Sequence, residues 1–329
     1  MKLTNIMPFN YTQLFKIQNK KHAKVQNFMQ IGCKILSLHP LILNEIVEIY
    51  TQKQQIAVAI ETLKSKNQTL GLVPTMGALH EGHLALVKKA LENNDKVVVS
   101  IFVNPTQFDN KEDLLKYPRT LDTDIELLKT TSKTAILVYA PTVDDIYEGK
   151  TVSETFDFDG LEFEMEGRFR KGHFNGVGTI VKRLFEIIKP DNAYFGEKDF
   201  QQLQIIKKLV EKHKLPLNIV GCKIHRETSG LAMSSRNTRL KPEYIEAAPF
   251  IYKTLTTAKK HFGTKSANKV SKWVENEFAK HHLLKLEYFI IADAATLKTL
   301  KRKTNNKKYR AFIAAYADDV RLIDNIALN

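Results

Sequence analysis

The chain has 329 residues, 43% of them hydrophobic and 26% charged, which is the balance of a globular protein with one large domain or two smaller ones. No apolar run reaches the roughly 18 residues of a membrane-spanning helix, and no secretory signal is evident, so we predict a soluble, cytoplasmic protein. The net charge of +14 suggests nucleic acid, an anionic membrane or a polyanionic small substrate as partner, while two distant cysteines, Cys33 and Cys222, argue against a disulfide framework or a structural zinc site.

Basic residues gather in two stretches. Residues 1–47 carry six lysines against one glutamate and show only weak periodicity. We interpret them as a basic extension that is poorly ordered or lies upstream of the true start, with Met29 as a candidate internal start. The second stretch covers residues 298–310. Charge runs of this kind usually form solvated surfaces, and we expect neither nucleic acid nor a membrane as partner.

Helices and short apolar strands alternate from Tyr50 onward. In chain order we predict helix 56–63, strand 69–73, helix 84–91, strand 97–103, helix 122–129, strand 135–139, helix 177–188, strand 193–195, helix 200–213 and strand 217–220. Continuous apolar strands suit a parallel sheet that helices cover on both faces. The predicted fold class is therefore α/β, a Rossmann-like doubly wound parallel sheet.

The pattern changes after about residue 237. We predict helices at 243–261 and 268–281, followed by strands at 286–291 and 310–315. Two helices followed by strands form an α+β arrangement. The predicted organisation is a basic extension at 1–47, a Rossmann-like domain at 48–229 and a smaller α+β domain at 230–329.

The strongest local signal begins where the first strand ends and the next helix starts. It comprises Met76, Gly77, Ala78, Leu79, His80, Glu81, Gly82 and His83. Ligands of open parallel sheets bind at the carboxyl ends of strands, where the N-terminus of the following helix attracts phosphate. Glycines allow close approach of the backbone, and the two imidazoles can donate to phosphate oxygens, whose negative charge favours their protonated form.

Other interpretations of this segment stay open at this point. The two histidines could be ordinary surface residues. A zinc-protease helix is disfavoured because the spacing of His80 and His83 is three rather than four and because a glycine lies between them. The segment also lacks the glycine patterns of dinucleotide-binding folds and of P-loops.

Two further clusters follow later strands or turns. Gly196, Glu197, Lys198 and Asp199 come directly after a predicted strand, where the lysine can neutralise a triphosphate. Met233, Ser234, Ser235 and Arg236 follow a glycine turn and can bind β- and γ-phosphates, with the arginine stabilising departing pyrophosphate. Taken alone, residues 196–199 are also typical of a capped helix start, and residues 233–236 are also typical of a capped turn.

Seven further short sequence strings follow in the same order along this chain as in one known family. They are residues 100–108, 117–120, 166–168, 172–174, 196–202, 230–237 and 321–325. With them, the sequence from about Tyr50 to the C-terminus resembles the pantothenate synthetase family of the nucleotidyltransferase superfamily. The resemblance implies a ligase that forms a carbon–nitrogen bond from pantoate and β-alanine with ATP, through a pantoyl-adenylate, giving pantothenate, AMP and pyrophosphate. It also implies a homodimer and Mg²⁺ on the phosphates.

The resemblance also assigns residues. The first cluster binds ATP with His83 as the proposed proton donor, and residues 196–199 and 233–236 complete the nucleotide site. Gln107 and Gln202 hold pantoate, Asn104 lies in the same wall, and Asp124 is a candidate near Mg²⁺. The loop 230–237 and the domain beyond it are expected to close over the intermediate.

Departures from the family are few: Thr106 replaces a usual Met, Ser229 a common Asp, and His225 a usually apolar residue at the adenine site, where contact is mainly through backbone.

Two alternatives remain. A non-catalytic nucleotide- or RNA-binding module would account for the basic charge, and another adenylyl-transferring enzyme would share the nucleotide motifs. Gln107 and Gln202 distinguish the enzyme classes, because a generic nucleotidyltransferase needs no such pair.

Overall fold

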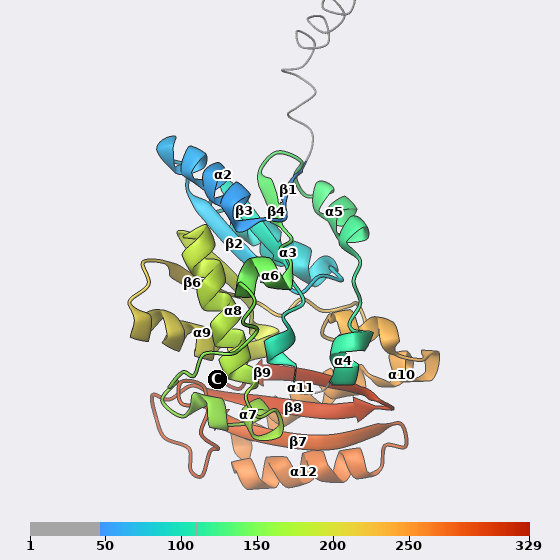
Figure 1. The fold of residues 1–329 in the computed structure, drawn as a ribbon. Coiled ribbons are helices and arrows are strands. Elements are labelled where there is room, and N and C mark those ends of the chain that lie inside the picture. Colours follow the sequence, from blue (N-terminus) through green and yellow to red (C-terminus); the bar gives the residue numbers. More distant parts are fainter. Residues whose placement is uncertain (1–46, 109–110) are drawn as a thin grey trace, which may run out of the picture. The chain divides into compact units, whose positions relative to one another are not determined.

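In the part of the chain that the structure describes, six parallel strands form the larger of two sheets, in the order β1–β4–β3–β2–β5–β6 (Figure 1). The computed structural model describes residues 47–108 and 111–329. The strands are β1 Glu48–Tyr50, β2 Leu70–Thr75, β3 Lys96–Ile101, β4 Ile136–Tyr139, β5 Asn192–Gly196 and β6 Asn218–Cys222. The predicted doubly wound sheet is therefore confirmed, with β1 as an additional edge strand.

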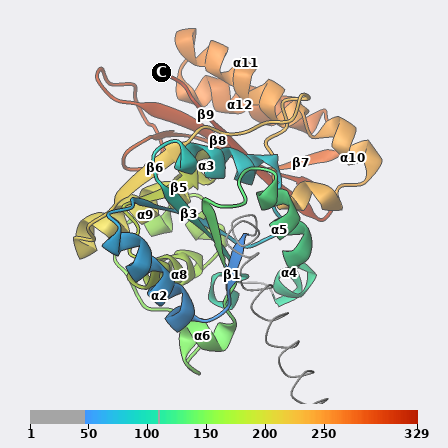
Figure 2. The same cartoon turned by 90° about the horizontal axis from the view of Figure 1, so that it is seen from above.

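Helices cover both faces of this sheet. They are α2 Lys53–Ser65, α3 Glu81–Leu91, α5 Leu121–Lys129, α8 His173–Ile188 and α9 Phe200–His213. Successive residues of β2 point to opposite faces: Leu72 packs in the apolar cluster under α2, α8 and α9, while Val73 packs in the cluster under α3 and α5 (Figure 2). Burial on both faces explains why the strands read as uninterrupted apolar runs.

Short helical segments connect these elements near the carboxyl ends of the strands. They are α4 Lys111–Lys116, α6 Val143–Tyr147, α7 Glu166–Phe169, and the 3₁₀ turns η2 Pro105–Gln107, η3 Leu161–Phe163, η4 Glu197–Asp199 and η5 Ser235–Arg239. The predicted nucleotide segments 196–199 and 233–236, and the predicted pantoate residues Asn104 and Gln107, lie in or beside such segments.

A three-stranded antiparallel sheet forms the C-terminal part, in the order β7–β8–β9. Its elements are α10 Pro242–Ala247, α11 Phe250–Thr264, α12 Ala267–Ala279, β7 Leu284–Asp293, β8 Tyr309–Ala317 and β9 Val320–Ala327. Phe289 of β7 packs with the cluster under α11 and α12, whereas its neighbour Tyr288 packs with the cluster of the larger sheet. Residues 47–329 consequently form one compact unit, and a boundary at residue 230 stays a prediction.

The structure differs from the sequence expectation in one helix and in two strands. The helix predicted at 243–261 is divided into α10 and α11 at Pro249, which has no N–H to continue the first helix. The strands β1 and β9 were not predicted, since β1 has three residues and β9 interrupts its apolar pattern with charged and amide side chains. The predicted extension at 1–47 lies almost entirely outside the described residues. Within the described part of the chain, no helix has the length and apolar character to cross a membrane.

Candidate active site

The turn that follows β2 carries the first predicted phosphate-binding segment. Gly77 and Ala78 have φ angles of 82° and 50°, so two consecutive residues are left-handed. Backbone N–H groups in such turns form concave anion-binding nests. The protein's own Asp124 carboxylate binds this backbone: its oxygens accept from the N–H of Ala78 at 3.0 Å and of Leu79 at 2.8 Å. Asp124 is 1% exposed and also accepts from the Thr120 hydroxyl at 3.1 Å, so the turn is fixed internally.

Two histidines cap α3 directly after this turn. The Nδ1 atom of His80 accepts from the N–H of Gly82 at 3.1 Å, and that of His83 accepts from the N–H of His80 at 3.3 Å. Since a neutral imidazole carries one proton, both rings hold it on Nε2. Burial first, and then nearby positive groups including Lys198, lowers the pKa of His80 to about 4 and that of His83 to about 3. Both rings can therefore donate from Nε2 as neutral imidazoles, and a protonated ring beside bound phosphate stays a prediction.

The other two predicted nucleotide segments lie around the same cavity, which has a volume of about 250 Å³. The turn at 196–199 follows β5, and β5 pairs with β2, so both turns stand at one edge of the sheet. The loop at 233–236 reaches them from the C-terminal side: the Ser235 hydroxyl donates to the Ala78 carbonyl at 2.9 Å. Arg236 forms an ion pair with Asp113 of α4 at 2.9 Å.

Amide side chains form another wall of this cavity. Asn104 is 1% exposed, donates to Gln107 Oε1 at 3.2 Å and accepts from the Tyr147 hydroxyl at 2.6 Å. The Gln107 amide lies 2.9 Å from the sulfur of Met76. Gln202 enters the cavity lining from α9. The wall therefore offers neutral donors and acceptors that suit hydroxyl and carboxylate oxygens.

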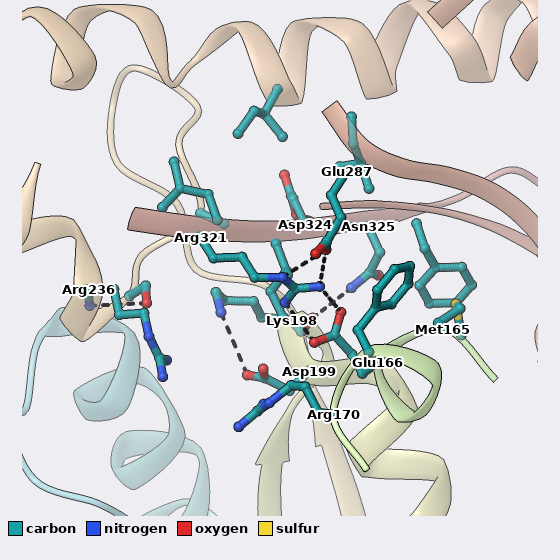
Figure 3. A pocket seen from close by; sticks show the side chains of 18 of the residues that line it. Met165, Glu166, Arg170, Lys198, Asp199, Arg236, Glu287, Arg321, Asp324 and Asn325 are labelled. Carbon is teal, nitrogen blue, oxygen red and sulfur yellow. Dashed lines mark hydrogen bonds and ion pairs between the residues drawn. The ribbon is translucent and has the colours of Figure 1, made fainter. Parts of the chain in front are cut away.

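A larger cavity of about 510 Å³ adjoins this one and shares Lys198 and Asp199 with it. Figure 3 shows Arg321 between two carboxylates in its lining. Its guanidinium donates to both oxygens of Glu166 at 2.7 and 2.8 Å, and its Nε donates to Glu287 at 2.8 Å. This charged group joins α7 of the larger sheet's part to β7 and β9 of the C-terminal sheet.

A model of the pantoate-beta-alanine ligase family matches residues 48–327 of the chain. The chain belongs to this family. It is 61% identical over 284 residues to a pantothenate synthetase of Christiangramia forsetii, covering 86% of this chain and 100% of that protein. A pantothenate synthetase of Flavobacterium psychrophilum is 59% identical over 280 residues, with 85% and 99% covered.

Solved structures agree with this assignment. The pantothenate synthetase of Thermus thermophilus superposes with a TM-score of 0.79 at 35% identity, covering 86% of this chain and 99% of that one. A pantoate-beta-alanine ligase of Francisella tularensis, complexed with beta-gamma ATP and beta-alanine, gives a TM-score of 0.69 at 36% identity, with 86% and 98% covered.

Most residues predicted from the family resemblance meet at the smaller cavity. Those that line it are Met76, His80, Gly82, His83, Asn104, Gln107, Gly196, Lys198, Asp199, Gln202, His225, Met233, Ser234, Ser235 and Arg236. Five predicted nucleotide-binding residues are not among its lining: Gly77, Ala78, Leu79, Glu81 and Glu197. These five belong to the turns and helix starts that carry the lining residues.

Asp124, the predicted Mg²⁺ candidate, has a different position. It lines neither cavity, and both of its oxygens accept hydrogen bonds from the protein. Among the described residues, no group of three or more His, Cys, Asp or Glu side chains could hold a metal ion. The geometry therefore assigns Asp124 to the turn, and a metal role has no support from its surroundings.

Two site residues were missed by sequence reasoning. Arg170 and His173, near the start of α8, line both cavities. The Nδ1 atom of His173 lies 2.8 Å from the Gln107 carbonyl, so this ring helps to fix the amide wall. Residues 172–174 belong to the family resemblance, but no local sequence pattern indicates which cavity the side chains of this region reach.

Proposed function

We propose that the chain condenses pantoate with β-alanine at the expense of ATP, releasing pantothenate, AMP and pyrophosphate. The observation that carries this proposal is the meeting of three phosphate-binding segments and two glutamine amides at one cavity. Family membership and relatives named pantothenate synthetase at up to 61% identity support it. A generic adenylyl-transferring enzyme would not need both Gln107 and Gln202.

In this proposal the triphosphate lies between the start of α3 and the turn at 196–199. Lys198 supplies a positive charge, and the Nε2–H groups of His80 and His83 supply donors whose direction the cap hydrogen bonds fix. His83 is the proposed proton donor. Arg236 stabilises the pyrophosphate as it leaves. Preorganised donors of this kind stabilise charge that develops in the transition state.

Pantoate binds beside Gln107, Gln202 and Asn104. One oxygen of its carboxylate attacks the α-phosphorus of ATP, and the bond from that phosphorus to the bridging oxygen of pyrophosphate breaks. The amine nitrogen of β-alanine then attacks the acyl carbon of pantoyl-adenylate, the bond from this carbon to AMP breaks, and the nitrogen loses a proton. Because the protein forms no covalent bond, positioning supplies most of the acceleration.

Mg²⁺ belongs to the proposal as a companion of the nucleotide. The side chains around Asp124 do not fit a metal held by the protein, since its carboxylate is already bound. Magnesium commonly reaches nucleotide sites with the phosphates and keeps several waters. We therefore place it on the triphosphate and route no step through a protein-held ion.

AMP formation tests the function directly. We expect AMP only when ATP, pantoate and β-alanine are all present, and its loss when either organic substrate is omitted. ATP labelled with ¹⁸O in the α,β-bridge should exchange its label positionally with pantoate alone, because adenylate formation is reversible. Label exchange that requires β-alanine would exclude the two-step path, and AMP formation without pantoate would favour another adenylyl transferase.

A homodimer in the cytoplasm completes the proposal, on the strength of the family resemblance. Light scattering behind a sizing column should give twice the 37.7 kDa mass of the chain. A mass of one chain at micromolar concentration would reject the dimer and leave the catalytic proposal untouched.

A further inference from the structure

The strand β9 contains residues 321–325, one of the strings on which the family resemblance rests. The catalytic proposal gives these residues no role. Asp324 and Asn325 are 4% and 2% exposed and line the larger cavity but not the smaller one. Figure 3 shows both residues among the side chains that line this cavity. Asn325 is bonded to a segment that carries predicted phosphate-binding residues, and Asp324 to the stretch that precedes another.

Asn325 is bonded to the turn that follows β5. Its amide nitrogen donates to the carbonyl oxygens of Glu197 and Lys198, at 2.9 and 2.8 Å. Its amide oxygen accepts from Arg310 of β8. Both N–H groups and the oxygen of one buried amide are thus engaged, and the two carbonyls they hold flank the Cα atom of Lys198.

Arg310 reinforces this contact from the neighbouring strand. It is 9% exposed, forms an ion pair with Glu197 at 3.1 Å, and lies over the ring of Phe200 with 4.1 Å to the centroid. Phe200 is the first residue of α9. The C-terminal sheet therefore contacts the 196–199 turn through its carbonyls, one side chain and the start of the next helix.

Asp324 is bonded to Arg226, in the stretch that precedes the loop at 233–236. Its carboxylate accepts two hydrogen bonds from Arg226, at 2.7 and 2.9 Å. Arg226 also donates to the carbonyl of Gly230 at 3.1 Å and lies over the ring of Tyr252 with 3.7 Å to the centroid. Gly230, at φ 92°, begins the loop that leads to Met233. Asp324 thereby fixes the base of the loop at 233–236.

We propose that Asn325 and Asp324 are positioning residues, through which one strand of the C-terminal sheet holds the turn at 196–199 and the loop at 233–236 at a fixed separation. Neither needs to touch substrate: Asn325 acts through the backbone of Lys198, and Asp324 acts through Arg226. The inference rests on the proposed function for its kinetic consequence, whereas its structural consequence is independent of any activity.

Asn325→Asp tests the positioning role of Asn325 most directly. It keeps the size of the side chain and an oxygen for Arg310, but it replaces the two N–H donors with an oxygen that repels the carbonyls of Glu197 and Lys198. We expect the KM for ATP to rise about 10- to 30-fold and kcat to fall, because two buried hydrogen bonds are lost. Pantoate affinity, measured without nucleotide, should fall less than ATP affinity, since Asn104 and Gln107 lie outside the turn at 196–199 and only Gln202 follows it on α9.

Amide hydrogen exchange gives a readout that needs no catalysis. In Asn325→Asp, exchange of the peptide covering 196–202 should accelerate at least about tenfold without added nucleotide, while that of 226–237 changes little. Asp324→Asn should give the converse pattern, fast exchange in 226–237 and little change in 196–202. Asn276→Asp, the same replacement on the exposed surface of α12, is the matched control and should alter neither segment.

The outcomes separate the two proposals. A wild-type exchange rate and a wild-type KM for ATP in Asn325→Asp would overturn the positioning role. Equal losses of ATP and pantoate affinity together with a lower Tm would also overturn it, because they indicate general destabilisation. If Asn325→Asp does not fold, Asp324→Asn alone decides by its effect on 226–237. Absence of AMP formation by the wild-type protein would reject the proposed function while leaving the exchange pattern as a valid test.

Discussion

The neutral state of the site histidines is set by two hydrogen bonds and by burial. Both Nδ1 atoms accept backbone N–H groups, and the pKa values fall to about 4 for His80 and about 3 for His83. We predict that ¹⁵N spectra show both rings neutral, with the proton on Nε2, from pH 8 to 5. Because folding lowers these pKa values, the stability they contribute is complete above about pH 6.5 and is lost as pH falls toward 3. Free histidine in the same tube is the control, and a titration of either ring near pH 6.5 would contradict the assignment.

The turn between β2 and α3 depends on one acidic side chain of a different helix. Asp124→Asn should lower the free energy of unfolding by about 2 kcal/mol, because one oxygen that accepts from a buried N–H becomes a donor. ATP affinity should fall with it, since the left-handed residues Gly77 and Ala78 lose their support. Asp122→Asn, on the exposed side of the same helix, is the control for urea denaturation and ATP binding. Recovery of ATP affinity by excess Mg²⁺ would instead restore the metal-ligand hypothesis.

Across the whole molecule, the group Glu166, Arg321 and Glu287 joins the two sheets. Arg321→Met should destabilise the protein by about 3–5 kcal/mol, because two largely buried carboxylates lose their shared cation. Adding Glu166→Gln to that variant should recover part of the loss, since one uncompensated charge disappears. Denaturant unfolding of the single and double variants measures the coupling. Additive effects in the double variant would show that the pair contributes nothing specific to the contact between the sheets.

The features predicted from the sequence are those that depend on a local pattern of residues. Apolar strands that end in glycine-containing turns located the sheet and placed Met76 and Lys198 at one edge of it. Side chains whose partners are distant in sequence could not be assigned. Asn325 bonds to carbonyls 127 and 128 residues earlier, and no periodicity signals such a contact. Asp124 near a helix start fits a metal ligand and a backbone acceptor equally well until the fold brings Ala78 to it.

The pairing of β2 with β5 also governs when the site can form during folding. Leu70 donates its N–H to Asp191, 121 residues further along the chain, at the start of this pairing. Closing so long a loop costs chain entropy before any contact offsets it, and folds rich in such contacts assemble slowly. His83 follows β2 and Lys198 follows β5. The two residues therefore come together in one nucleotide site only after β2 and β5 have paired. A refolding chain should therefore acquire nucleotide affinity in its slow cooperative phase, with no earlier intermediate that binds.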